Sequence, residues 1–128
     1  MVKRIQRKRS KGWRNPPNTI YVGRPTKWGN PFMLSGDMIY IDASHRRKMS
    51  PFVFFKFGDK NDVVQLFEHL LKGTQFVDKE VDVNYWVDHF KKLDLSELKG
   101  KNLSCWCPIG SPCHADLLLK YANRKIRN

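Results

Sequence analysis

The apolar residues of this chain come in short runs separated by prolines, glycines and polar residues, and this pattern restricts the chain to a small mixed fold. β-branched and aromatic residues fill four of the runs, which predicts strands over residues 19–22, 38–41, 52–57 and 101–107. The turn-rich segment 23–36 is expected to have no regular structure. No run approaches the ~18 apolar residues that cross a bilayer, so we expect no transmembrane segment.

Three further segments carry apolar residues at the spacing of a helix. The first helix is expected to start at Asn61 or Asp62 and to end at Gly73. The second opens at Asp82, and the third begins with Ser111 as its N-cap and continues close to the end of the sequence. These elements predict an α/β (or α+β) fold, a single small domain with a short central sheet flanked by three helices.

The formal net charge of +12 at pH 7 is unevenly distributed. Residues 1–50 hold twelve Lys and Arg residues against two acidic ones, whereas residues 51–100 hold seven against nine. Residues 1–18 carry no acid and are predicted to form a basic flexible arm in front of an α/β domain over residues 19–128. Segregated positive charge attracts polyanions, so phosphate-bearing partners are expected.

The chain has three cysteines, an odd number, and all lie between Cys105 and Cys113. Such a cluster does not form the distributed disulfide framework of a secreted protein. The basic amino terminus is not followed by the apolar stretch of a signal peptide. We therefore expect a cytoplasmic protein that binds no membrane, and the sequence leaves its oligomeric state open.

The cysteine-rich stretch supports a first hypothesis of a zinc-stabilised interaction module. Cys105, Cys107, Cys113 and His114 supply the four donors of a structural zinc site. Only one residue separates the first two cysteines, and neighbours such as Cys113 and His114 point in different directions on a helix. Both facts weigh against a shared metal, so no cofactor is expected and zinc stays the alternative.

Two other interpretations of the same stretch remain open. In one, Cys113 is a nucleophile in the first turn of a helix, and His114 and Asp116 do acid–base work on a nucleotide or modified base. In the other, the thiols fill the core, and the start of the helix that follows a strand binds an anion.

A second conspicuous stretch, residues 23–32, has the composition of a nucleotide pocket. Arg24 and Lys27 suit phosphate, Trp28 offers a stacking plane and Asn30 has an amide that reads a base edge. The alternative is a structural turn in which Trp28 covers the core.

The sequences Tyr21-Val22-Gly23-Arg24-Pro25-Thr26-Lys27-Trp28-Gly29-Asn30-Pro31-Phe32 and, later, Cys105-Trp106-Cys107 with Cys113-His114-Ala115-Asp116 resemble a family of bacterial and phage proteins, domain of unknown function 4326. The resemblance implies no established activity. It implies that the two blocks belong to one domain, and we expect them to meet at one site. The basic arm lies outside the resemblance. The matching positions are Arg24, Trp28, Asn30, Cys105, Cys107, Cys113, His114 and Asp116.

The sequence thus favours a nucleic-acid-binding protein of viral or phage origin over a small enzyme acting on nucleotides and over a zinc-stabilised module. Trp13, Trp28 and Trp106 somewhat favour single-stranded nucleic acid over duplex. The residues expected to bind nucleic acid or its phosphates are Arg7, Arg9, Lys11, Arg14, Arg24, Lys27, Trp28, Asn30, Arg46 and Arg47.

Overall fold

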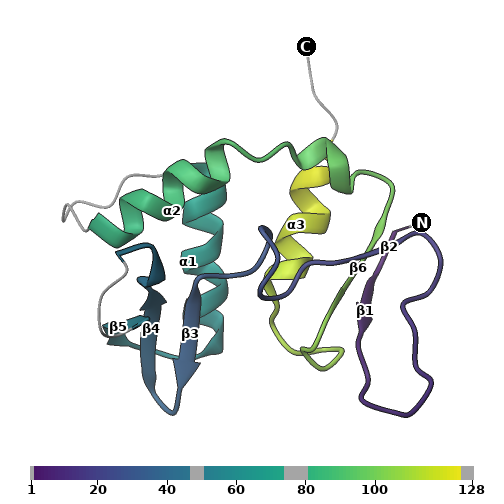
Figure 1. The fold of residues 1–128 in the computed structure, drawn as a ribbon, viewed down its shortest axis with the longest axis horizontal. Coiled ribbons are helices and arrows are strands. Elements are labelled where there is room, and N and C mark those ends of the chain that lie inside the picture. The colour runs from purple at the N-terminus through teal and green to yellow at the C-terminus, as the bar shows by residue number, and fades with distance from the viewer. Residues whose placement is uncertain (1, 47–50, 74–80, 125–128) are drawn as a thin grey trace. The chain divides into compact units, whose positions relative to one another are not determined.

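The computed structural model describes residues 2–46, 51–73 and 81–124. The chain divides into two compact units (Figure 1). Unit 1 combines Met1–Gly29 with Asp94–Asn128, and unit 2 is the continuous segment Asn30–Leu93.

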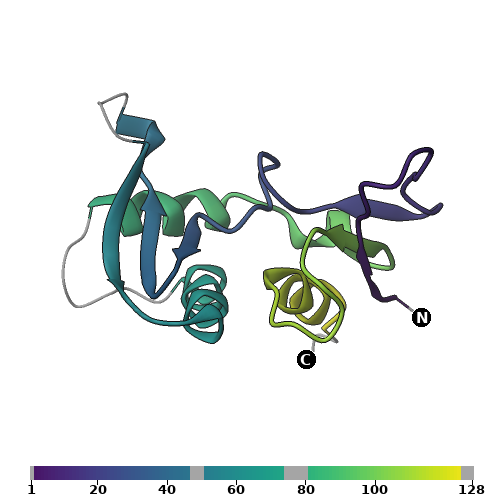
Figure 2. The ribbon, with the colours of Figure 1, turned by 90° about the horizontal axis from the view of Figure 1, so that it is seen from below.

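Unit 1 is built on a parallel sheet of three strands, β1 (Arg4–Gln6), β2 (Thr19–Tyr21) and β6 (Asn102–Cys105). β6 is the middle strand, and its Leu103 lies opposite Arg4 on one side and Ile20 on the other. The helix α3 (His114–Ala122) packs on β6 and on the short helix η2 (Leu95–Leu98), and Figure 2 shows it along one face of the sheet.

Unit 2 is built on an antiparallel sheet of β3 (Phe32–Ser35), β4 (Met38–Asp42) and β5 (Phe52–Phe57). The helices α1 (Lys60–Lys72) and α2 (Val81–Lys91) pack against each other, α1 also against β3 and α2 against β4. A short helix, η1 (Ser44–Arg46), follows β4. The core of this unit contains the fully buried Phe32, Ile39, Ile41, Phe67 and Leu70.

The structure confirms the α/β class and the three helices, while the strands form two three-stranded sheets instead of one central sheet. β3 corrects the expectation that residues 23–36 lack regular structure. Gly36 and Asp37 form a two-residue hairpin turn between Ser35 and Met38, and Gly36 adopts the positive φ of 62° that such a turn requires. No helix among the described residues is long and apolar enough to cross a membrane.

β1 lies inside the segment that the sequence predicts to be a flexible arm. Its residues pair in parallel with β6, and the backbone N–H of Arg7 extends the pairing by donating to the carbonyl of Cys105 at 2.7 Å. A strand of three residues is too short for an alternating pattern to stand out in a sequence. Its partner is also about a hundred residues away in the chain, which local sequence patterns do not reveal.

The first helix starts earlier than expected, because Asp59 is its N-cap in place of Asn61 or Asp62. The Asp59 carboxylate accepts the N–H of Asp62 at 3.0 Å, and the Asp62 carboxylate accepts the N–H of Asp59 at 2.8 Å. These two bonds make a capping box, which satisfies donors that the helix itself leaves unpaired. Gly73 ends the helix with a left-handed backbone, as expected.

We expect Asp59→Ala to lower the free energy of unfolding by about 1 kcal/mol, since the N-cap acceptor is lost. Urea denaturation followed by circular dichroism measures the change. Asp88→Ala removes an exposed carboxylate within α2 and should change stability by less than about 0.5 kcal/mol. Equal effects of the two substitutions would contradict the role of the cap.

Candidate functional site

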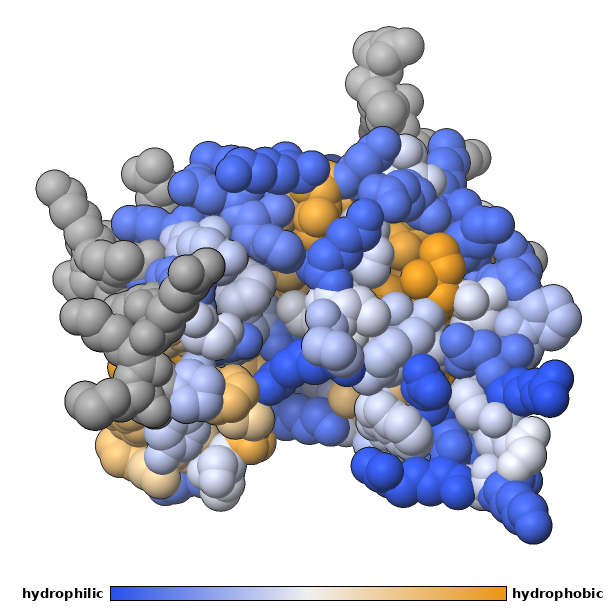
Figure 3. Space-filling view, in the orientation of Figure 1, coloured by the Kyte–Doolittle hydropathy of each residue, from blue (hydrophilic) through white to orange (hydrophobic). Residues whose placement is uncertain are grey.

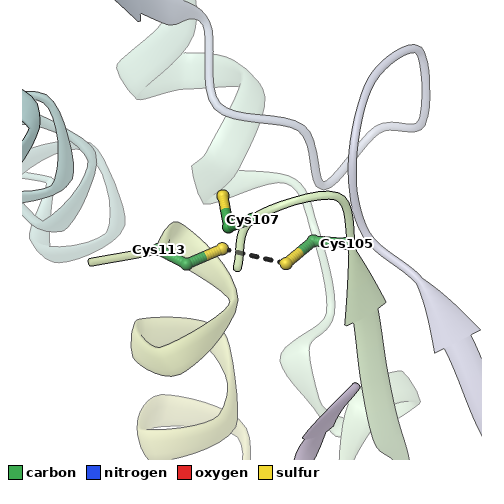
Figure 4. Close-up of side chains that lie close together, drawn as sticks. All are labelled: Cys105, Cys107 and Cys113. Atoms are coloured by element: carbon green, nitrogen blue, oxygen red, sulfur yellow. Dashed lines mark hydrogen bonds between the residues drawn. The ribbon is translucent and has the colours of Figure 1, made fainter. Parts of the chain in front are cut away.

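The three cysteines of the chain lie together at one end of the parallel sheet (Figure 4). Cys105 is the last residue of β6, Cys107 lies on the following loop, and Cys113 directly precedes α3. Their sulfur atoms are all within 4.8 Å of one another, and the sulfurs of Cys105 and Cys113 are 3.1 Å apart. Cys105 and Cys113 are buried and Cys107 is half-buried. The structure therefore brings together three of the four residues that the sequence offers as zinc ligands.

Cys113 is the N-cap of α3, where Ser111 was expected. Its backbone is extended, with φ −151° and ψ 141°, so the expectation that Cys113 and His114 diverge as helical neighbours is wrong. The Nδ1 atom of His114 lies 3.7 Å from the Cys113 sulfur. Sequence reasoning missed this because it placed the start of the helix before Cys113.

Arg4 contacts the cysteine cluster and the loop around it. Its guanidinium donates to the carbonyls of Pro108 and Ser111 at 3.2 and 3.0 Å, and it pairs with the Asp116 carboxylate at 3.2 Å. Another of its N–H groups points at the sulfur of Cys105, 4.0 Å away. The side chain is only 8% exposed. Sequence reasoning missed Arg4, since the residue falls in the predicted arm and only the pairing of β1 with β6 brings it here.

The residues of the predicted nucleophilic site have other partners in the structure. Hydrogen bonds to Cys105 and Cys107 and burial of the thiol raise the pKa of Cys113 well above its usual range. A nucleophilic cysteine needs the opposite shift, because the thiolate is the reactive form. Asp116 is paired with Arg4. This geometry gives the enzyme hypothesis no support, and the hypothesis stays a prediction.

The two sequence blocks of the family resemblance meet in unit 1. The Nε2 atom of His114 donates to the carbonyl of Val22 at 2.8 Å, which joins the start of α3 to the residue after β2. Burial lowers the pKa of His114, and the positive charge of Arg24 acts in the same direction. Arg24 is exposed and close enough to act on the buried ring electrostatically. The expectation that the blocks meet is confirmed for these residues.

The other residues of the predicted nucleotide pocket are placed differently. Lys27 pairs with Glu97 at 3.0 Å and lies 5.3 Å from the ring centre of Trp28. Trp28 is 4% exposed, which leaves little of its ring for a base. Asn30 belongs to unit 2, where its side chain donates to the carbonyl of Val63 and accepts the N–H of Phe32.

A surface that we call the arginine–aromatic face comprises Arg7, Arg9, Trp13, Tyr21 and Trp106, all in unit 1. The guanidinium carbon of Arg7 lies 4.3 Å from the ring centre of Tyr21, 5.1 Å from that of Trp106 and 5.7 Å from that of Trp13. The guanidinium carbon of Arg9 lies 4.6 Å from the ring centre of Trp106. Arg7 and Arg9 thus lie against aromatic rings from β2 and from the residue that follows β6.

Lys11 and Arg14 are exposed on the same segment. Arg46 ends η1, and Arg47 lies outside the described residues. Sequence reasoning missed one pair in unit 2, His45 with Asp82, whose Nε2 and carboxylate oxygen are 2.9 Å apart. No local pattern links residues on η1 and α2, so the sequence carried no signal for this pair.

Comparison with the curated proteins and with the solved structures finds no match to the chain. The family model described as a domain of unknown function, DUF4326, matches residues 5–124. This match corrects the expectation that residues 1–18 lie outside the family, since it includes most of β1 and the whole arginine–aromatic face. Because the match covers most of the sequence, the chain belongs to the DUF4326 family.

Proposed function

We propose that the protein binds single-stranded nucleic acid through the arginine–aromatic face of unit 1. The observation that carries the proposal is the position of two guanidinium groups, those of Arg7 and Arg9, over the ring of Trp106. Unpaired bases stack on aromatic rings and guanidinium planes, and arginine also pairs with the phosphates between them. A surface that offers both aromatic rings and guanidinium groups therefore suits a nucleic-acid strand whose bases are unpaired.

The exposed parts of this face support the proposal. Trp106 is 41% exposed although it lies between two buried or half-buried cysteines, so part of its ring is open to a base that stacks on it. Arg9 is exposed and Trp13 is half-buried. The face therefore offers an aromatic plane and a cation to a ligand from solvent.

Positive charge surrounds the face. The loop between β1 and β2 has no acidic residue. Its exposed cations are Lys8, Arg9, Lys11 and Arg14. Figure 3 shows this loop as strongly hydrophilic side chains interleaved with paler ones. A single-sign field of this kind attracts a polyanion before any specific contact forms.

Binding to a single-stranded oligonucleotide should depend steeply on salt. If about five phosphates are neutralised, the logarithm of the affinity should fall with that of the salt concentration with a slope near −3.5. Fluorescence anisotropy with a labelled oligonucleotide at several salt concentrations measures the slope. Arg9→Ala should reduce its magnitude by about 0.7, whereas Lys92→Ala, which removes an exposed cation in unit 2, should not change it.

The sharpest test is Trp106→Ala. Loss of one stacking ring costs about 1–3 kcal/mol, so the affinity should fall about 5- to 150-fold. Phe57→Ala is the matched control, because it removes an aromatic ring that is 65% exposed in unit 2. The circular dichroism of both variants should match that of the parent protein.

Point substitutions are preferable to deletion of residues 1–14, because the deletion removes β1 together with Arg4. A parent protein that binds no oligonucleotide at low salt would refute the proposed function. Equal losses in Trp106→Ala and Phe57→Ala would refute the assignment of binding to this face.

A further inference from the structure

We propose that Cys105, Cys107, Cys113 and the Nδ1 atom of His114 bind a zinc ion in unit 1. The inference goes beyond nucleic-acid binding and rests on different residues. Three thiolates and one imidazole are a common ligand set of structural zinc, which takes four ligands in a tetrahedron. The bound ion would hold the loop 106–112 against β6 and the start of α3.

The distances among the three sulfur atoms fit a zinc ion after small movements, and His114 completes the set from its place beside the Cys113 sulfur. Tetrahedral zinc with Zn–S bonds of about 2.3 Å holds its sulfur ligands about 3.8 Å apart. The three sulfurs are within 4.8 Å of one another, and the shortest separation, Cys105 to Cys113, is 3.1 Å. The Nδ1 atom of His114 is 3.7 Å from the Cys113 sulfur, close to the separation that two ligands of one zinc ion adopt.

The hydrogen bond of His114 leaves the correct nitrogen available to a metal. A carbonyl only accepts, so the 2.8 Å contact with Val22 requires the ring proton to be on Nε2. Nδ1 then carries the lone pair, on the side of Cys113. A zinc-bound histidine typically donates its other ring N–H to a carbonyl or carboxylate, which fixes the orientation of the ring.

The charge around the cluster also fits a bound ion. Three thiolates and one divalent cation leave one negative charge, and Arg4 places a nearly buried positive charge beside the sulfurs. The Asp116 carboxylate pairs with the same guanidinium at 3.2 Å, and another N–H group of Arg4 is directed at the Cys105 sulfur. N–H groups that point at sulfur are the outer contacts that stabilise a metal thiolate.

The test starts with the metal content of the full chain, purified without chelators or a metal-affinity tag. Inductively coupled plasma mass spectrometry should give about one zinc ion per chain. After removal of zinc, Co²⁺ should restore binding and produce the visible bands of a tetrahedral site together with an ultraviolet thiolate-to-cobalt band. Cys107→Ser removes a half-buried ligand and should reduce the ultraviolet band by about a third.

Ser104→Ala is the control for Cys107→Ser. Ser104 is fully buried on the same strand as Cys105, and its hydroxyl has no hydrogen-bond partner among the described residues, so this variant should fold and keep the metal. Zinc content far below one ion per chain, with no cobalt spectrum from a folded protein, would overturn the proposal. Iron in place of zinc, or a native mass lower by two hydrogens from a Cys105–Cys113 disulfide, would overturn it equally. These results do not depend on whether the protein binds nucleic acid.

Discussion

Replacing Arg4 with methionine (R4M) is expected to lower the free energy of unfolding by about 2 kcal/mol, through the loss of charge-assisted hydrogen bonds. The substitution keeps much of the apolar stem and removes the guanidinium that donates to the carbonyls of Pro108 and Ser111. Two acceptors of the loop then lose a donor, and the Asp116 carboxylate loses its partner. Guanidinium chloride denaturation of the parent and R4M proteins measures the difference.

Two further variants separate the geometry of Arg4 from its charge. Arg4→Lys keeps the charge but lacks the planar fork that reaches several acceptors, so it should lose more than half as much stability as R4M. Lys3→Met removes an exposed neighbouring cation and should change stability by less than about 0.5 kcal/mol. An R4M protein as stable as Lys3→Met would show that the Arg4 side-chain contacts do not stabilise unit 1.

Replacing Leu103 with alanine (L103A) is expected to cost about 2–5 kcal/mol. Leu103 is fully buried in the middle strand of the parallel sheet, and it lies opposite Arg4 of β1 and Ile20 of β2. Because β6 is the strand that joins the other two, a cavity there weakens the packing beneath the whole sheet. Thermal unfolding followed by calorimetry measures the loss.

Ile109→Ala is the matched control for L103A. Ile109 is 63% exposed on the loop after β6, so its truncation creates no cavity and should change stability by less than about 0.5 kcal/mol. A small effect at both positions would contradict the central place of β6 in unit 1.

The elements that the sequence predicted are those with a strong local pattern. The helix that ends at Gly73 shows apolar residues at helical spacing and a glycine with a left-handed backbone, both visible without any partner. β1 depends instead on a strand about a hundred residues later, and β3 depends on a hairpin turn at Gly36, which the sequence pattern places in a longer irregular segment. The division of the strands between two sheets follows from pairing, which local patterns do not specify.

The candidate sites show the same limit at the level of side chains. The sequence identified Cys105, Cys107, Cys113 and His114 as a group, but an N-cap predicted two residues too early changed the expected direction of His114. The sequence could not identify Arg4 as part of the site, because Arg4 lies beside the cysteines only when β1 pairs with β6. Charge and composition indicate basic residues near the amino terminus, whereas one of the rings beside Arg7, that of Trp106, follows a strand about a hundred residues later.

The order in which the ribosome makes this chain matters for unit 1. β1 and β2 are synthesised first, yet the strand that joins them is made only after the whole of unit 2, the continuous segment Asn30–Leu93. At ordinary rates of translation, β6 is therefore synthesised on the order of ten seconds after β1 and β2. Unit 2 has all its residues by then, so its folding starts first, and unit 1 closes a long loop of chain in its last step.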